Sequence, residues 1–265
     1  MLPSVNVVAV VTHASAATVA PAIARLEAVA QAANVELVFD EGAVDGADLA
    51  VVLGGDGTML RALARFHGTR IPVIGVNYGR VGFLTAITAD GLEDGLARVF
   101  AGDYQTVELA TLEVEVGGTT KVAVNDVVVA GGTLGRMVEL GHAIGGEELG
   151  VQPCDGLICA SPAGSTAYNL SNGGPVLVWG LEAMVLTFVA PHALDVRPLV
   201  VPRGSDTVIT NRTKGLAAVV LVDGHEVGRL AHDEQAVVRV GHGASLLATL
   251  PEVTFFRRYG ATFGH

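Results

Sequence analysis

Residues 54–58 read Gly-Gly-Asp-Gly-Thr and stand between an apolar run and a helical pattern, an arrangement that could bind phosphate. Glycines accept positive φ and let a phosphate approach the backbone closely, and a helix that starts there turns free N–H groups toward it. Thr58 could cap that helix or offer its hydroxyl to phosphate. Asp56 is the exception, because a carboxylate repels phosphate unless it holds a metal ion or acts on a hydroxyl proton. The pattern therefore predicts Asp56 as a general base that orients an alcohol attacking phosphorus.

The same turn, taken alone, is also compatible with an ordinary Gly-Asp-Gly turn before a capped helix. It does not match the Gly-x-x-x-x-Gly-Lys-Ser/Thr pattern of P-loop ATPases. It also lacks the Gly-x-Gly-x-x-Gly spacing of the usual dinucleotide-binding turn. Both of these common nucleotide-binding loops are therefore disfavoured.

Two motifs in the second half of the chain could bind a nucleotide. Asn125 and Asp126 lie within an apolar strand pattern, where polar side chains need partners such as a ribose or a base edge. A strand end with an Asx turn is the alternative. Residues 155–168 run from an apolar strand into a turn of small and hydroxyl side chains that ends at Tyr168, whose ring could stack on a base. A flexible connection is the alternative for this stretch.

The pattern of expected helices and strands that must position these motifs changes along the chain. In the first hundred residues, apolar runs alternate with helical patterns, which is typical of a parallel sheet covered on both faces. The expected strands are residues 5–11, 35–39, 49–53 and 71–76, and the expected helices are residues 17–33 and 59–66. Beyond Tyr104 strands prevail, at residues 106–116, 121–129, 140–144, 217–222 and 236–240, with helices around residue 170 and at 181–186. We expect an α/β N-terminal domain with a parallel, Rossmann-like sheet, plus a mainly-β C-terminal domain.

The composition of the chain argues against several classes of protein. The chain has 265 residues, half of them apolar, with a mean hydropathy of +0.50 and a net charge of −11. This charge argues against nucleic-acid and anionic-membrane partners, and no apolar run reaches the roughly 18–20 residues of a spanning helix. The N-terminus has no signal-peptide pattern, so a cytoplasmic protein is expected. Cys154 and Cys159 fill no zinc template and are expected to be packed as free thiols.

The order of the motifs resembles that of the NAD kinase family over nearly the whole chain. The glycine turn alone is shared with lipid kinases, whereas the complete ordered set is specific. The segments that carry the resemblance are residues 54–58, 75–85, 125–126, 136–140, 155–175, 191–199 and 222–224.

The resemblance implies an enzyme that transfers the terminal phosphoryl group of ATP or polyphosphate to the adenosine-ribose 2′-hydroxyl of NAD, forming NADP. Asp56 corresponds to the catalytic aspartate, and Mg²⁺ or another divalent cation would arrive with the donor rather than on a protein metal site. The implied phosphate-binding residues are Gly54, Gly55, Gly57 and Thr58. The implied NAD-binding residues are Asp56, Gly57, Phe83, Asn125, Asp126, Asp155, Thr166, Ala167, Tyr168 and Ser171.

The resemblance also implies how the chain is organised. The N-terminal domain would comprise residues 1–104 and 250–265, and the C-terminal domain residues 105–249. Asp155 matches a residue that reaches NAD bound to a neighbouring subunit, so a homodimer or homotetramer is implied.

Two positions depart from the family pattern. Ala163 replaces a threonine whose hydroxyl could bond phosphate or ribose, and Pro153 stands where a basic residue is common. Either change could weaken substrate binding, although neither removes Asp56. Two other functions share some of these features, namely a lipid kinase with the same glycine turn and a non-enzymatic NAD(P) sensor. The acidic composition argues against the first, and the presence of Asp56 argues against the second.

Overall fold

A computed structural model describes residues 4–12, 16–39, 46–78, 82–133, 135–193 and 195–264 of the chain. Contacts divide the chain into two compact units, each with an apolar core of its own. Unit 1 comprises Met1–Glu108 and Ser245–His265, and unit 2 comprises Leu109–Ala244.

Unit 1 contains a parallel sheet in the order β2-β1-β3-β4. Its strands are β1 (Val7–Thr12), β2 (Glu36–Val38), β3 (Leu49–Leu53), β4 (Val73–Asn77) and the short β5 (Ile87–Thr88), which pairs with β4. Every residue of β3 and β4 is buried, because helices cover both faces of the sheet. Continuous apolar runs are the sequence pattern that such strands require.

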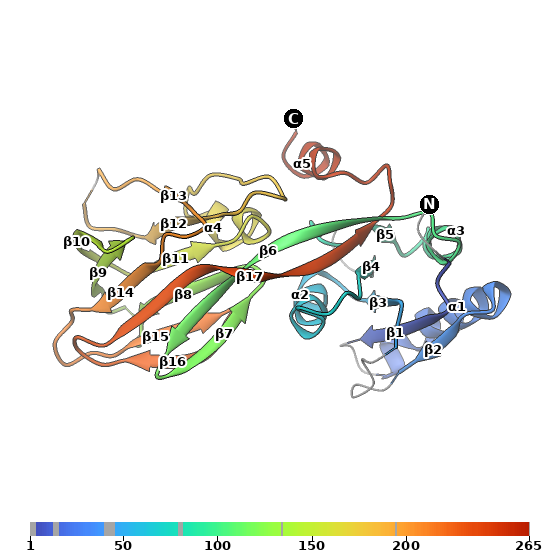
Figure 1. Ribbon diagram of the computed structural model, residues 1–265, viewed down its shortest axis with the longest axis horizontal. Helices are drawn as coiled ribbons and strands as arrows, with labels where there is room; N and C mark the ends of the chain where they lie inside the picture. The colour runs from blue at the N-terminus through green and yellow to red at the C-terminus, as the bar shows by residue number, and fades with distance from the viewer. Residues whose placement is uncertain are drawn as a thin grey trace. The chain divides into compact units, whose positions relative to one another are not determined.

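Helices α1 (Ala16–Ala33) and α3 (Leu92–Phe100) pack on one face of this sheet and share its core. Helix α2 (Asp56–Arg65) contacts β3 and β4 (Figure 1). Gly75 of β4 lets α2 approach closely, because a side-chain carbon at this position would lie 2.6 Å from the sulfur of Met59. The predicted helix at residues 59–66 is confirmed, but it begins three residues earlier, so that Asp56 is its first residue.

The C-terminal segment also belongs to unit 1. Strand β17 (Gln235–Thr249) pairs with β4 in parallel at Leu247, and helix α5 (Phe255–Phe263) follows it. Arg98 of α3 forms an ion pair of 2.6 Å with Glu252, in the link between β17 and α5. In Figure 1, this segment is the red end of the chain.

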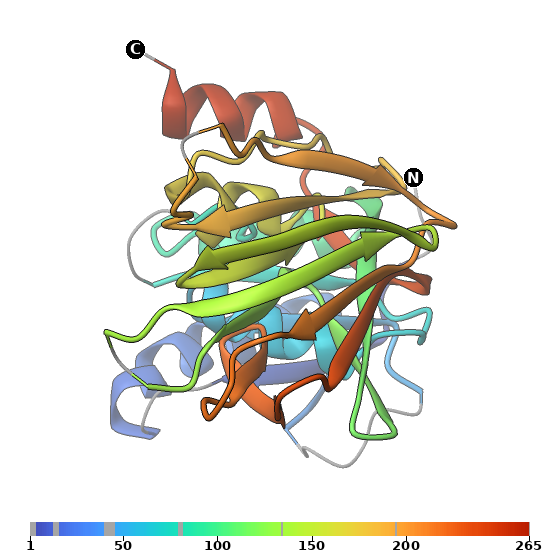
Figure 2. The same cartoon turned by 90° about the vertical axis from the view of Figure 1, so that its left-hand side faces the viewer.

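Unit 2 is built from two β-sheets that enclose a core of valine, leucine, isoleucine and methionine side chains. The first sheet holds β6 (Gln105–Val116), β7 (Thr119–Ala123), β9 (Val138–Ile144), β10 (Glu147–Cys154), β14 (Thr207–Asn211) and part of β17. Figure 2 shows the β9–β10 hairpin in light green beside β14 in orange.

The second sheet of unit 2 is antiparallel throughout, in the order β13-β12-β11-β8-β15-β16. Its strands are β8 (Asp126–Gly131), β11 (Gly156–Ala160), β12 (Ala183–Val189), β13 (Leu199–Pro202), β15 (Ala218–Val222) and β16 (His225–Leu230). A 3-10 helix, η1 (Gly164–Thr166), and the short helix α4 (Tyr168–Ser171) follow β11. The expected fold class, α/β followed by mainly β, is confirmed.

Two expected elements were wrong. Residues 121–129 form the end of β7 and the start of β8, which belong to different sheets, because the chain changes sheets at Val124 and Asn125. Residues 181–186 were expected to be helical, but β12 occupies most of them. Met184 and Val185 point into different apolar cores, so β12 is apolar on both faces, and periodicity cannot separate such a strand from a buried helix.

Among the described residues, no helix is long and apolar enough to cross a membrane.

Candidate active site

The glycine turn of unit 1 connects β3 to α2. Gly55 is the N-cap residue of α2, and Thr58 lies inside the helix. The alternative that Thr58 caps the helix is therefore wrong. Thr58 is 8% exposed and packs on Gly54, where a side-chain carbon would lie 2.6 Å from the Thr58 hydroxyl. Gly55 and Gly57, by contrast, have open space beside their α-carbons. A ligand could therefore approach the backbone closely at these two positions.

The carboxylate of Asp56 is held by the segment that follows β4. Asp56 Oδ2 accepts a hydrogen bond of 2.7 Å from the backbone N–H of Phe83, and Oδ1 accepts one of 3.1 Å from that of Leu84. The side chain is half-buried and lies in the first turn of α2, where the helix dipole favours negative charge. These bonds fix the direction of the carboxylate while leaving it partly exposed.

Phe83 is placed against the C-terminal helix. Its ring packs edge-on against Phe255 at 5.5 Å and stacks on Phe263 at 6.2 Å between ring centroids. Phe83 is only 8% exposed, and both of these rings belong to α5. Residues 79–81 of the same sequence motif lie outside the described residues.

In unit 2, the Asn125-Asp126 pair lies at the turn between β7 and β8. The carboxylate of Asp223 accepts hydrogen bonds from the backbone N–H groups of Val124 (2.9 Å), Asn125 (2.8 Å) and Asp126 (3.1 Å). Asp223 itself has a φ of 46°, a left-handed conformation that aspartate tolerates better than most residues. The Val-Asp-Gly motif therefore shapes the Asn-Asp motif from 97 to 99 residues away along the chain.

The small-residue turn after β11 packs on the same pair. Ser161 donates its hydroxyl to Val124 O at 2.6 Å, and its backbone N–H donates to Asn125 O at 2.8 Å. Gly164 touches the backbone of Asn125, where any side chain would overlap it. Three sequence motifs of unit 2 therefore meet at Asn125.

Other predicted residues of unit 2 lie along η1, α4 and the start of β11. Tyr168 is 46% exposed at the start of α4, and Ser171 is exposed at its end. Thr166 and Ala167 are half-exposed, and Asp155 is exposed between β10 and β11. The predicted site residues thus form two groups, namely residues 54–58 with Phe83 in unit 1, and the remainder in unit 2.

Burial shifts the pKa values of Asp126 and of the neighbouring Asp223. It raises the pKa of Asp126 to about 7, and the charge of Asp223 acts in the same direction. Burial also raises the pKa of Asp223, against the opposing effect of its three backbone hydrogen bonds. Close acidic pairs of this kind are frequent where a protein binds or transforms a ligand.

Two family models together match most of the chain. The model of the ATP-NAD kinase N-terminal domain matches residues 7–104, and that of the ATP-NAD kinase C-terminal domain matches residues 124–250. The chain belongs to the NAD kinase family.

Individual NAD kinases support this membership over most of their length. The NAD kinase of Heliobacterium modesticaldum is 44% identical over 217 residues, which are 79% of this chain and 76% of that protein. The NAD kinase of Gemmatimonas aurantiaca is 37% identical over 247 residues, which are 86% of each chain. Phosphorylation of NAD to NADP is the reaction of the family, so the predicted enzyme class is confirmed and both alternatives lose their support.

Solved structures carry the same fold. An NAD kinase from Archaeoglobus fulgidus in complex with ATP superposes with a TM-score of 0.80, at 25% identity over 97% of both chains. Yeast NADH kinase complexed with NADH has a TM-score of 0.85, at 21% identity over 99% of this chain and 88% of that one. The second likeness shows the fold alone.

Sequence reasoning missed Asn169, whose side chain shapes the NAD kinase motifs of unit 2. Asn169 is fully buried, donates to Ser165 O (2.9 Å) and Pro175 O (3.0 Å), and accepts a bond from Thr187 (2.7 Å). Its amide occupies the space beside Gly174, which explains the glycine there. In the sequence, Asn169 comes shortly before Gly173-Gly174-Pro175, and this proximity is the one signal that could have indicated its role.

The structure shows the surroundings of Ala163 and Pro153, the two departures from the NAD kinase pattern. Ala163 is 3% exposed, and the hydrogen bonds that Ser161 makes with Val124 and Asn125 persist beside it. Pro153 lies in β10 opposite Glu139. The framework of the turn thus remains intact without the usual threonine.

The two thiols are structural. Cys154 and Cys159 are buried and free, as predicted, and burial raises the pKa of both to about 12. Over the part of the chain that the structure describes, no group of three or more His, Cys, Asp and Glu side chains could hold a metal ion.

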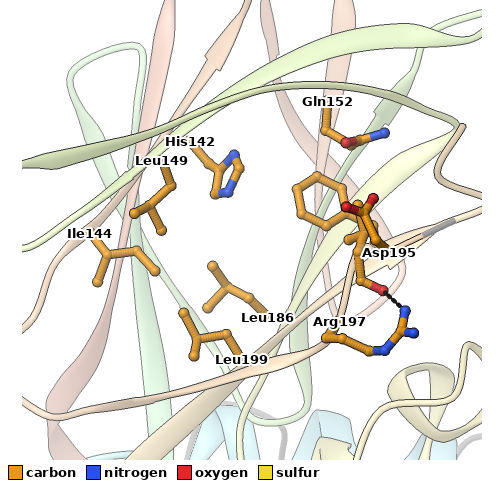
Figure 3. Close-up of a pocket in the computed structure, with 10 residues that line it drawn as sticks. His142, Ile144, Leu149, Gln152, Leu186, Asp195, Arg197 and Leu199 are labelled. Atoms are coloured by element: carbon orange, nitrogen blue, oxygen red, sulfur yellow. Dashed lines mark hydrogen bonds between the residues drawn. The ribbon is translucent and has the colours of Figure 1, made fainter. Parts of the chain in front are cut away.

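One cavity of unit 2 holds none of the predicted site residues. It measures about 340 Å³ and is bordered by six apolar residues and by Gln152, His142, Asp195 and Arg197 (Figure 3). Leu149 of β10 and Leu199 of β13 border it and are 49% and 47% exposed. This apolar region has no part in the geometry around Asn125.

Proposed function

We propose that Asp56 orients the adenosine-ribose 2′-hydroxyl of NAD and accepts its proton during phosphoryl transfer. The observation that carries this proposal is the fixed carboxylate at the start of α2, held by the N–H groups of Phe83 and Leu84. A carboxylate held from one side keeps its remaining acceptor capacity for a hydroxyl. Catalysis of this kind depends mainly on alignment and on neutralisation of charge.

In the proposed step, a bond forms between the ribose 2′-oxygen and the terminal phosphorus of the donor. The bond between this phosphorus and the bridging oxygen breaks, and the shortened donor leaves with the electron pair. Asp56 takes the hydroxyl proton late in the step. Gly54, Gly55, Gly57 and Thr58 would receive the donor phosphates at the N-terminus of α2, with Gly55 and Gly57 open to close approach.

We further propose that the donor carries Mg²⁺ or another divalent cation on its phosphate oxygens. The resemblance to the family, in which the cation arrives with the donor, supports this proposal. The cation would neutralise phosphate charge, which an acidic protein of net charge −11 does not do by its overall field.

The NAD-binding residues of unit 2 are proposed from the same resemblance and from their geometry. Asn125 Oδ1 is buried, and no hydrogen-bond partner for it exists within the described chain. An acceptor in this state is costly unless a ligand donates to it. Tyr168 offers an exposed ring on which the adenine could stack. The other proposed contacts are Asp126, Asp155, Thr166, Ala167 and Ser171 of unit 2, and Gly57 and Phe83 of unit 1.

We also propose that the protein is a homodimer or homotetramer in the cytoplasm. The exposed Leu149 and Leu199 beside the cavity of Figure 3 support association, because apolar surface of this kind tends to mark an interface. The division into an N-terminal domain of residues 1–104 and 250–265 and a C-terminal domain of residues 105–249 also stays a proposal.

The test is an NADP-forming assay on the purified protein with NAD, Mg²⁺ and either ATP or polyphosphate. We expect Asp56→Asn to lower kcat about a hundredfold or more while NAD still binds with similar affinity. Asp94→Asn is the matched control, because Asp94 is an exposed aspartate in the first turn of α3. Near-normal turnover by Asp56→Asn would refute the role proposed for Asp56.

A further inference from the structure

We infer that Arg258 of α5 is a positioning residue for phosphoryl transfer, because it fixes the backbone segment whose N–H groups hold the Asp56 carboxylate. The inference rests on the proposed role of Asp56 and adds a residue about 200 positions away in the chain.

Arg258 binds the segment next to Asp56 from the side opposite to the carboxylate. Its Nη1 donates to Phe83 O at 2.8 Å and also to Thr85 O, and its Nη2 donates to Thr249 Oγ1 at 2.9 Å. The same segment donates its Phe83 and Leu84 N–H groups to Asp56. One stretch of three residues therefore links the guanidinium to the carboxylate through its peptide groups.

The segment is also held by its side chain. Phe83 packs between Phe255 and Phe263, which lie before and after Arg258 on the same helix. Thr249 donates its hydroxyl to Val253 O at 2.9 Å, which ties the acceptor of Arg258 to the turn that leads into α5. The helix thus holds both the carbonyl groups and the ring of the segment.

The electrostatic setting agrees with this geometry. Arg258 is 6% exposed, and burial lowers its pKa to about 10, while the negative charge of Asp56 acts in the opposite direction. The guanidinium therefore keeps its charge near neutral pH. A buried charge carries a large desolvation cost, so hydrogen bonds to several acceptors are needed to offset it.

The shape of the guanidinium explains why this position needs arginine. Its planar fork can donate to two carbonyl groups and one hydroxyl at once, in fixed directions. A lysine at the same place would keep the charge but would reach these acceptors with a single nitrogen. We therefore expect lysine to restore the function of Arg258 only in part.

The experiment compares Arg258→Ala, Arg258→Lys and the control Arg257→Ala in the full chain. Arg257 is the exposed neighbour on the same helix. We expect Arg258→Ala to lower kcat by at least about tenfold with the dissociation constant of NAD changed less than about threefold. The kcat of Arg258→Lys should lie between those of Arg258→Ala and the unaltered protein. The kcat of Arg257→Ala should equal that of the unaltered protein. Free guanidinium ion at millimolar concentration should restore part of the turnover of Arg258→Ala.

A double-mutant cycle with Asp56→Asn separates positioning from a general loss of stability. If Arg258 acts through Asp56, the double variant should lose little more activity than Asp56→Asn alone. Losses that multiply, or an effect on NAD binding without an effect on kcat, would overturn the inference about Arg258. If Arg258→Ala fails to fold, the same cycle with Arg258→Lys tests whether Arg258 acts through Asp56. An active Asp56→Asn variant would instead overturn the proposed function itself.

Discussion

Gly82 and Asp56 are in such close contact that a side-chain carbon on Gly82 would occupy the space of the Asp56 carboxylate. The closeness has a clear structural cause, because the next two residues, Phe83 and Leu84, turn their N–H groups onto that carboxylate. Gly82 therefore belongs to the chemistry of the site although it has no side chain of its own.

Replacing Gly82 with alanine should displace the carboxylate or break one of its two hydrogen bonds. A displacement on the order of 1 Å at a reacting group can cost about a hundredfold in rate. We expect Gly82→Ala to lower kcat by about tenfold to a hundredfold, measured as NADP formation at saturating NAD and ATP.

Gly260→Ala is the matched control for Gly82→Ala. Gly260 lies within α5, has open space beside its α-carbon and does not adopt a positive φ. Alanine is favoured over glycine inside a helix, so this variant should be as active as the unaltered protein and equally or more stable. Equal activity of the two variants would show that the contact with Asp56 is unimportant.

The fold could be predicted from sequence where a pattern is local. The apolar run of β3 and the glycine turn after it identified the position of Asp56, since a strand, a turn and a helix follow one another within about fifteen residues. The strand β12 was mistaken for a helix because both of its faces are buried, which removes the alternation that marks a strand.

The partners of the site could not be predicted, because they are distant in sequence. The bonds from Phe83 and Leu84 to Asp56 span 27 and 28 residues, and the bond from Arg258 to Phe83 spans 175. No period or motif spacing encodes such contacts. Asp223 belonged to a recognised motif, yet only the structure shows that it organises the turn at Asn125.

Asp223 should matter for both stability and NAD binding. Its carboxylate satisfies three backbone N–H groups at the turn that holds Asn125 and Asp126, and Asp223→Ala would leave them without this acceptor. We expect Asp223→Ala to lower the free energy of unfolding by about 2–4 kcal/mol and to weaken NAD binding, as measured by denaturant titration and calorimetry.

The control for Asp223→Ala is Asp233→Ala. Asp233 also has a positive φ, of 67°, but it lies in an exposed turn and pairs with Arg212 at the surface. Surface ion pairs contribute little, so the cost in stability should come mainly from the strained backbone and NAD affinity should not change. Weaker NAD binding by Asp233→Ala would mean that the effect is not specific to the turn at Asn125.

Leu149 should contribute to self-association. It is 49% exposed beside the cavity of Figure 3, and a glutamate there would place a charge in a desolvated contact between subunits. We expect Leu149→Glu to shift the protein toward monomers in sedimentation velocity. Leu181→Glu, at a residue that is 46% exposed and does not border the cavity, should leave the sedimentation unchanged. An unchanged coefficient for Leu149→Glu would exclude this region from the interface.

Asp126 should make stability depend on pH. Its pKa in the folded chain is raised to about 7 by burial and by Asp223, whereas an aspartate in an unfolded chain titrates near about 3.9. Between these values the folded chain keeps a proton that the unfolded chain has released, so the free energy of unfolding decreases as the pH rises.

Asp126→Asn removes this titration while preserving the shape of the side chain. The variant should be more stable than the unaltered protein by roughly 2–4 kcal/mol at pH 8. The difference should disappear below about pH 4, where Asp126 is protonated in both the folded and the unfolded chain. Asp155→Asn, at an exposed aspartate of the same unit, should follow the unaltered protein at every pH. Denaturant titrations at pH 4, 6 and 8 measure both variants. If the difference in stability between Asp126→Asn and the unaltered protein is equal at all three pH values, Asp126 has the same pKa in the folded and the unfolded chain, and burial does not govern its protonation.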